Sequence, residues 1–168
     1  MLTKEIAMFI DEQAVVPIKV YYRRKNRTYE AYTESELRKL IADRKKIEEE
    51  LKKSPSPKKQ NELDQFPQIK EEDYMVLELK MRELNWGLYN ELQEDGTATT
   101  EDGRRIFDYK QYKENKLRKL IVQWSAEKDG KGVPINEISI KKMSPDIAEA
   151  ILRAYDEENM IEDEEEKK

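Results

Sequence analysis

The sequence predicts an α+β fold: an N-terminal β-hairpin plus helix, a linker, and a mostly helical C-terminal unit. Apolar and polar residues alternate over roughly residues 17–32, which predicts two strands. A helix-start signature follows at once, and a Pro-rich break comes after that helix. We place the hairpin-plus-helix unit at 1–53, the linker at 54–70, the helical unit at 71–157 and an acidic tail at 158–168.

The N-terminal unit begins with two predicted elements. Apolar residues at helical spacing behind Thr3, a suitable N-cap, predict a short helix over 3–12. The hairpin follows over 17–32, and its turn lies in the polar run 24–27. Asn26 suits that turn because its short polar side chain tolerates the left-handed backbone conformation.

The helix after the hairpin has clear start and stop signals. Thr33 with Glu36 three residues later forms a capping box, in which each side chain bonds the backbone N–H of the other residue. An apolar stripe continues to Leu51. Because Pro cannot continue a helix and restrains the residue before it, the helix should end at 54–57. The remainder of 54–70 is polar and contains Pro, which favours a linker.

Residues 74–82 fit two different periodicities. Apolar residues occupy every second position over 75–81, which suits a strand. Apolar residues also recur three and four apart over 74–88, which suits a long helix. We favour the strand, followed by a helix that Asn85 caps.

Two helices close the chain. The segment 95–107 precedes them, and its two Asp-Gly turn signals predict a loop with a short hairpin. Asp108 with Gln111 forms a second capping pair, and 144–146 (Ser-Pro-Asp) places a cap, a Pro and an acid at the start of the last helix. The predicted buried stripe of the first of these helices is Leu117, Leu120, Ile121 and Trp124.

The composition argues against most enzyme chemistry. The 168 residues include no Cys and no His, which excludes thiol nucleophiles, Ser-His pairs and ordinary zinc sites. Gly130 and Gly132 are too closely spaced for a dinucleotide fingerprint and indicate a turn, and no Gly-Lys-Ser/Thr triplet occurs. We therefore expect that the chain is not an enzyme and that it has neither a cofactor nor a metal site. With neither a signal peptide nor an apolar span, we expect a cytoplasmic protein without a membrane partner.

The charge is divided along the chain, although the net value is only −5. Residues 17–60 hold 14 Lys/Arg and 7 Asp/Glu, whereas residues 61–168 hold 17 and 27. Solvated helix faces would explain this division. The sharper hypothesis is a basic surface that meets an acidic partner.

The hairpin 17–32 is a candidate nucleic-acid interface. Its basic side chains can reach phosphates, and its aromatic rings can stack on bases. In the structural explanation, alternate Tyr side chains pack inward while Lys and Arg protect an edge strand from aggregation. As an alternative function we therefore consider a nucleic-acid-binding accessory protein. Its contacts would be Tyr21, Arg23, Arg24, Lys25, Arg27 and Tyr29.

Apolar side chains of the C-terminal unit are candidate protein-binding anchors. Tryptophan serves both in cores and as the central anchor of interfaces. The candidates are Trp86 and Trp124, with Leu88 and Leu120 beside them.

Residues 74–157 also carry a series of short motifs. They are Leu-Glu-Leu-Lys-Met-Arg-Glu-Leu-Asn-Trp-Gly-Leu-Tyr-Asn-Glu-Leu at 77–92, Phe-Asp-Tyr-Lys-Gln-Tyr at 107–112, Leu-Arg-Lys-Leu-Ile-Val-Gln-Trp at 117–124, Val-Pro-Ile at 133–135 and Met-Ser-Pro-Asp-Ile-Ala-Glu-Ala-Ile-Leu at 143–152. The series resembles small structural and tail-assembly-chaperone proteins of tailed bacteriophages, which have a similar strand, a helix, a second helix ending in Trp, a turn and a closing helix.

The resemblance implies a non-enzymatic morphogenesis protein. Its partners would be other phage structural proteins, such as tail or head–tail components. It would act in the host cytoplasm or remain in the virion, and a homo-oligomer is compatible with the same anchors.

Overall fold

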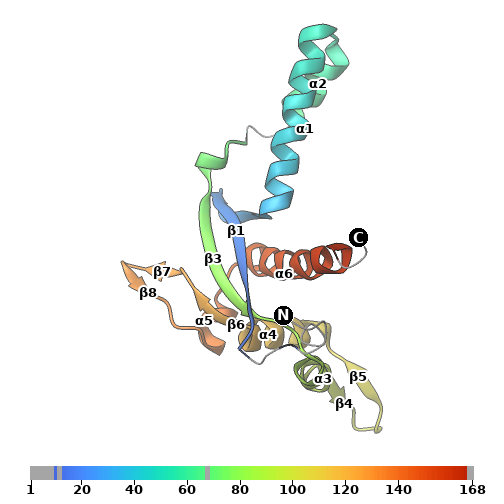
Figure 1. Ribbon diagram of the computed structural model, residues 1–168, viewed down its shortest axis with the longest axis vertical. Helices are drawn as coiled ribbons and strands as arrows, with labels where there is room; N and C mark the ends of the chain where they lie inside the picture. The colour runs from blue at the N-terminus through green and yellow to red at the C-terminus, as the bar shows by residue number, and fades with distance from the viewer. Residues whose placement is uncertain (1–9, 11–12, 67–68, 166–168) are drawn as a thin grey trace, which may run out of the picture.

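A four-stranded antiparallel sheet lies at the centre of the fold (Figure 1). The computed structural model describes residue 10, residues 13–66 and residues 69–165, with side chains described up to Asn159. The strands stand in the order β2-β1-β3-β6. Their bounds are β1 Val15–Lys25, β2 Thr28–Thr33, β3 Met75–Arg82 and β6 Ile121–Trp124.

Strand β1 is the long central strand and pairs with both β2 and β3. Ile18 stands opposite Leu79, and Val20 stands opposite Leu77. Strand β2 pairs with β1 only from Val20 onward, so the first half of β1 has β3 on one side and no strand on the other. Pro17 lies in this half, where a residue without an N–H is tolerated because one side needs no ladder hydrogen bond.

Helix α6 (Pro145–Glu165) crosses one face of the sheet and closes the main core (Figure 1). Side chains alternate across a strand, so every second residue of β1 and β3 points to this helix. Each aliphatic side chain buried here contributes about 1.5–3 kcal/mol. The buried strand residues are Val16, Ile18, Val20, Leu77, Leu79 and Met81, and α6 contributes Ala150, Ile151, Leu152, Ala154 and Tyr155.

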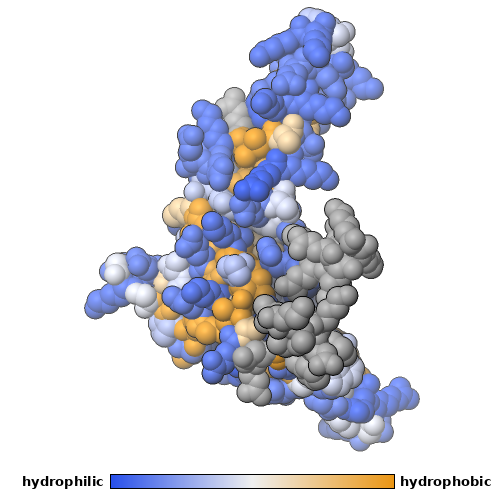
Figure 2. All heavy atoms as spheres, in the orientation of Figure 1, coloured by the Kyte–Doolittle hydropathy of each residue, from blue (hydrophilic) through white to orange (hydrophobic). Residues whose placement is uncertain are grey.

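Helices α1 (Glu34–Lys53) and α2 (Pro57–Gln65) form an arm that projects away from the sheet (Figure 1). The space-filling view shows the far end of this arm as almost entirely hydrophilic (Figure 2). Its base packs on the opposite sheet face from α6, in a small cluster that includes Tyr21, Leu37 and Tyr74. Arg44 joins the two helices because its guanidinium donates to the carbonyl of Phe66 at 2.9 Å, just after α2.

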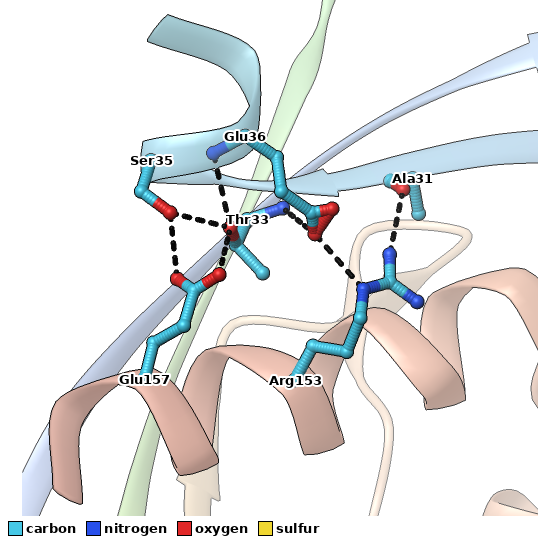
Figure 3. A network of polar contacts seen from close by, with 6 residues as sticks. All are labelled: Ala31, Thr33, Ser35, Glu36, Arg153 and Glu157. Atoms are coloured by element: carbon cyan, nitrogen blue, oxygen red, sulfur yellow. Dashed lines mark hydrogen bonds and ion pairs between the residues drawn. The ribbon is translucent and has the colours of Figure 1, made fainter. Parts of the chain in front are cut away.

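A polar network of six residues joins the end of β2 and the start of α1 to α6 (Figure 3). The hydroxyl of Thr33, which is 1% exposed, accepts from the backbone N–H of Glu36 at 3.2 Å and donates to Glu157 at 3.0 Å. Ser35 donates to the other carboxylate oxygen of Glu157 at 2.8 Å. Arg153 donates to the Glu36 carboxylate at 2.9 Å. The base of the arm is therefore fixed to α6 as well as to the sheet.

The remaining elements lie between β3 and α6 in the sequence, apart from a short 3-10 helix before β3. Strands β4 and β5 pair as one small hairpin, and β7 and β8 pair as another. The bounds are η2 Glu71–Asp73, α3 Trp86–Asp95, β4 Thr97–Thr99, β5 Arg105–Phe107, α4 Tyr109–Leu120, β7 Glu127–Lys128, β8 Lys131–Gly132 and α5 Glu137–Lys141.

Several sequence predictions are confirmed. The fold class is α+β, and the hairpin turns at Asn26, whose φ is 58°. Thr33 and Glu36 form the capping box. Residues 75–82 are a strand, and Asn85 caps the helix that follows. The helix predicted over 3–12 lies outside the described residues, apart from residue 10.

The predicted boundaries within the chain differ from the structure in three places. Residues 54–70 contain α2. Helix α1 ends at Lys53, just before Ser54 and Pro55, and Pro57 then occupies the first position of the new helix, where its missing N–H is no loss. Strands β1 and β3, which the sequence places in different units, are neighbours in one sheet. Residues 158–165, expected in an acidic tail, continue α6, and Glu is a good helix former.

The predicted stripe of the helix before Trp124 is also wrong in its second half. Helix α4 ends at Leu120, and Ile121–Trp124 is strand β6. Ile121 and Val122 are β-branched and favour extended backbone, and pairing with β3 decides the matter.

Candidate protein-binding surface

Five large apolar side chains are exposed on α3, β5 and the start of α4. They belong to elements that lie side by side at one end of the molecule (Figure 1). Trp86 is 75% exposed and Tyr109 is 60% exposed, values far above those of residues that serve the core. We call the set the aromatic surface: Trp86, Tyr89, Ile106, Phe107 and Tyr109.

Local sequence explains how α3 and β5 present these side chains. Asn85 caps α3 by accepting from the backbone N–H of Leu88 at 2.8 Å, which fixes the position of Trp86 in the first turn. The β4–β5 hairpin places Phe107 opposite Thr97, directly after α3. The ring of Phe107 lies over Gly96, so close that a Cβ there would stand 2.9 Å from Cε2.

Ring contacts organise the aromatic surface in two groups, one on α3 and one formed by β5 with the start of α4. The rings of Trp86 and Tyr89 stack with centroids 5.5 Å apart and 18° between planes. Tyr112 lies against both Phe107, at 5.2 Å, and Tyr109, at 6.1 Å. Burial raises the pKa of Tyr112, and the Tyr89 hydroxyl raises it further. Aromatic pairs of this kind add about 0.5–1.5 kcal/mol each.

Ion pairs hold the two helices beneath the aromatic surface together. Lys119 of α4 donates to Glu91 of α3 at 2.5 Å and also to Asp95. Burial of Lys119 opposes its charge, but these two hydrogen bonds prevail and raise its pKa. Lys113 lies over the ring of Tyr109 at 4.7 Å and pairs with Glu149 of α6 at 2.7 Å. The surface is thus presented on a fixed support.

The four predicted protein-binding anchors have different fates. Trp86 is the most exposed member of the aromatic surface. Leu88 is partly buried against the main core, and Leu120 is fully buried, so Leu120 cannot reach a partner. Trp124 is half-buried, and its indole N–H donates to the carbonyl of Val133 at 2.6 Å. It lies on β6 and is not part of the aromatic surface.

Sequence reasoning missed four members of the aromatic surface. They are Tyr89, Ile106, Phe107 and Tyr109. The β4–β5 hairpin folds back on α3, so that Phe107 lies over Gly96 and against Tyr109. The signal available in the sequence is the aromatic spacing of Phe107, Tyr109 and Tyr112 around the Asp108 cap.

Two of the six candidate nucleic-acid contacts are engaged in contacts within the fold. Tyr21 is 5% exposed beneath α1, so it cannot stack on a base. Arg23 pairs with Glu30 and lies over the ring of Tyr74 at 4.8 Å. Tyr74 in turn donates to Glu30 at 2.7 Å, and burial together with this carboxylate raises its pKa. The structural explanation given above, in which alternate Tyr side chains pack inward, applies to Tyr21.

The other hairpin candidates lie near its tip. Arg24 and Arg27 are exposed, and Lys25 approaches Glu30 at 3.8 Å. Tyr29 is half-buried and contacts Tyr22 on the face that α6 also covers. The six predicted contacts therefore do not form one surface.

Two further observations concern sites of other kinds. Among the residues that the structure describes, no three acidic side chains converge as a metal site would require. No helix in the described ranges combines the length and the apolar run that spanning a membrane demands. No protein-family model, curated protein or solved structure matches the chain.

Proposed function

We propose that this chain is a non-enzymatic assembly protein that binds another protein through the aromatic surface. The observation that carries the proposal is the exposure of five large apolar side chains, led by Trp86 at 75%. Contiguous apolar patches are uncommon on monomers and mark interaction sites. Trp and Tyr are the residues that most often dominate binding energy at interfaces.

The rigidity of the support favours the same function. Ion pairs between α3 and α4 and the cap at Asn85 hold the rings in place before any partner arrives. Preorganisation lowers the entropy cost of binding, so more of the contact energy appears as affinity.

The proposed partner is a structural protein of a tailed-phage tail or head–tail junction. The resemblance over 74–157 motivates this choice, and the whole aromatic surface lies within that range. The function is then morphogenetic, and the anchor is Trp86.

Titration calorimetry tests the proposal. The full chain would be titrated with each tail and head–tail protein encoded near it, and Trp86→Ala should weaken binding by at least about 30-fold, the effect typical of a hot-spot residue. Because Trp86 is exposed, the substitution should leave the free energy of unfolding nearly unchanged. Met75→Ser is the matched control, since Met75 is 54% exposed but lies at the opposite end of β3 from α3.

Two results would contradict the proposal. One is binding of a virion protein that Trp86→Ala and Tyr109→Ala leave intact. The other is an absence of virion partners together with salt-sensitive binding of DNA or RNA, which would favour the alternative function.

A further inference from the structure

A groove of about 560 Å³ lies on the α6 side of the sheet, apart from the aromatic surface. Strand residues Tyr22 and Leu77 form its floor, Trp124 and the β7–β8 hairpin form one wall, and α5 with the start of α6 forms the other. We call it the Trp124 groove. Its volume is in the range of sites that hold small ligands or peptide side chains.

The lining of the Trp124 groove is apolar and aromatic. The indole N–H of Trp124 already donates a hydrogen bond to the Val133 carbonyl. A ligand in the groove would therefore contact the face of the Trp124 ring. Tyr22 and Tyr29 contact each other at 6.2 Å along one side. Ile138 on the other side is 65% exposed, the highest value among the aliphatic side chains that the structure describes as exposed.

The charge of the Trp124 groove is opposite to that of the chain. Asp and Glu make up 37 of the 168 residues, yet none of them lines the groove. Its two charged lining residues are Lys128 and Lys142. Within the described ranges neither lysine forms an ion pair, whereas Lys141 next to Lys142 pairs with Glu137. The groove therefore offers apolar surface between two cations.

We infer that the Trp124 groove binds an acidic, apolar segment of a partner protein. Aromatic and aliphatic side chains of the segment cover Trp124 and Ile138, and its carboxylates pair with Lys128 and Lys142. Complementary charge of this kind sets specificity and speeds association. The site goes beyond the proposed function, because it shares no residue with the aromatic surface and would give the protein a second point of attachment.

Fluorescence anisotropy with designed peptides tests the inference on the full chain. The probe is a short fluorescein-labelled peptide in which Glu alternates with Leu and Phe, compared with a Gln version and a Lys version. The Glu peptide should bind about tenfold more tightly than the Gln peptide, as two partly exposed ion pairs would supply. The Lys peptide should bind most weakly.

Charge reversal supplies the sharper test. The double variant Lys128→Glu/Lys142→Glu should reverse the preference, so that the Lys peptide binds more tightly than the Glu peptide. The matched control is Lys110→Glu/Lys131→Glu, which makes the same change in net charge at exposed lysines that do not line the groove, and it should keep the original preference. Ile138→Ser should weaken all three peptides, and its exposure keeps folding unaffected.

Several outcomes would overturn the inference. Equal affinity for the Glu and Gln peptides would show that Lys128 and Lys142 do not contribute to binding. Failure of every peptide to bind would show that the groove is not a peptide-binding site. Self-association that the double variant abolishes would make a second copy of this chain the occupant. Binding of an oligothymidine probe in place of the Glu peptide would assign the groove to nucleic acid. Trp86→Ala should change none of these measurements, so failure here is distinct from failure of the proposed function.

Discussion

Replacing Thr33 with Val should weaken the attachment of α1 to α6. The change keeps the shape of the side chain but removes the hydroxyl that caps α1 and donates to Glu157. Loss of an N-cap costs about 1 kcal/mol, and loss of a hydrogen bond to a charged group costs about 1.5–3 kcal/mol. Because Ser35 still donates to Glu157 at 2.8 Å, we expect a total loss of about 2–4 kcal/mol in the free energy of unfolding.

Thr33→Ser separates the hydroxyl from the methyl group. It keeps both hydrogen bonds and loses only one buried methyl, so it should cost about 1 kcal/mol. Urea unfolding followed by circular dichroism measures both variants, and an unchanged m-value shows that the surface exposed on unfolding is the same. In a double-mutant cycle, Glu157→Gln should cost less in the Thr33→Val background than in the parent.

The reasoning fails if the Thr33→Val and Thr33→Ser variants are equally stable. In that case the Thr33 hydroxyl contributes nothing that water does not replace. It also fails if Glu157→Gln has the same effect in both backgrounds, since the two side chains would then be energetically independent.

Two further predictions concern the core and the support of the aromatic surface. Burial raises the pKa of Tyr155 to about 12, against an ordinary value of about 10, so the stability that its neutral form provides is complete below pH 10 and is lost as pH rises toward 12. Tyr155→Phe loses the hydrogen bond to the Arg82 carbonyl and should lower the free energy of unfolding by about 1 kcal/mol at neutral pH. In urea unfolding at several pH values, the free energy of unfolding should fall less steeply above pH 10 for this variant than for the parent. The same dependence on pH in both proteins would refute this. Gly96→Ala should destabilise by about 1–3 kcal/mol because its Cβ would meet Phe107 at 2.9 Å and the Cβ of Tyr112 at 3.1 Å. The Cβ of Gly87→Ala would have only Asn85 Oδ1 near it, at 3.6 Å, so this variant should stabilise α3 by up to about 1 kcal/mol. Thermal unfolding measures both variants, and a change of Tm in the same direction for both would contradict the packing argument.

The sequence predicts those parts of the fold that local chemistry decides. Thr33, Asn85 and Asp108 are identifiable as caps because capping depends on side chains within three residues of one another. The alternation in β1 and β3 also reflects local burial on one face of a sheet. Partners of the strands are a different matter, since nothing in either segment specifies that β1 pairs with β3 across the arm.

The same limit applies to the candidate site. Residue type alone singles out Trp86, but its exposure depends on which face of α3 the core takes. Leu120, its predicted companion, is fully buried because α4 turns that face to the main core. Phe107 reaches the end of α3 at Gly96 only through the β4–β5 hairpin, a tertiary arrangement that periodicity does not encode.

The insertion of the arm between β2 and β3 has a consequence for synthesis on the ribosome. Strand β1 can pair with β2 as soon as the hairpin emerges, but its other edge has to wait until α1, α2 and β3 have been made. At about 5–20 residues per second, that wait lasts for several seconds. During it, Val20 has one unpaired edge, and Val16 and Ile18, which β2 does not reach, lie in a half of β1 with both edges unpaired, a template for aggregation. Pro17 and Lys19 separate these apolar residues, and both are exposed in the folded sheet. A Pro and a Lys on an unpaired strand oppose its pairing with another chain, so they also protect the nascent chain from aggregation.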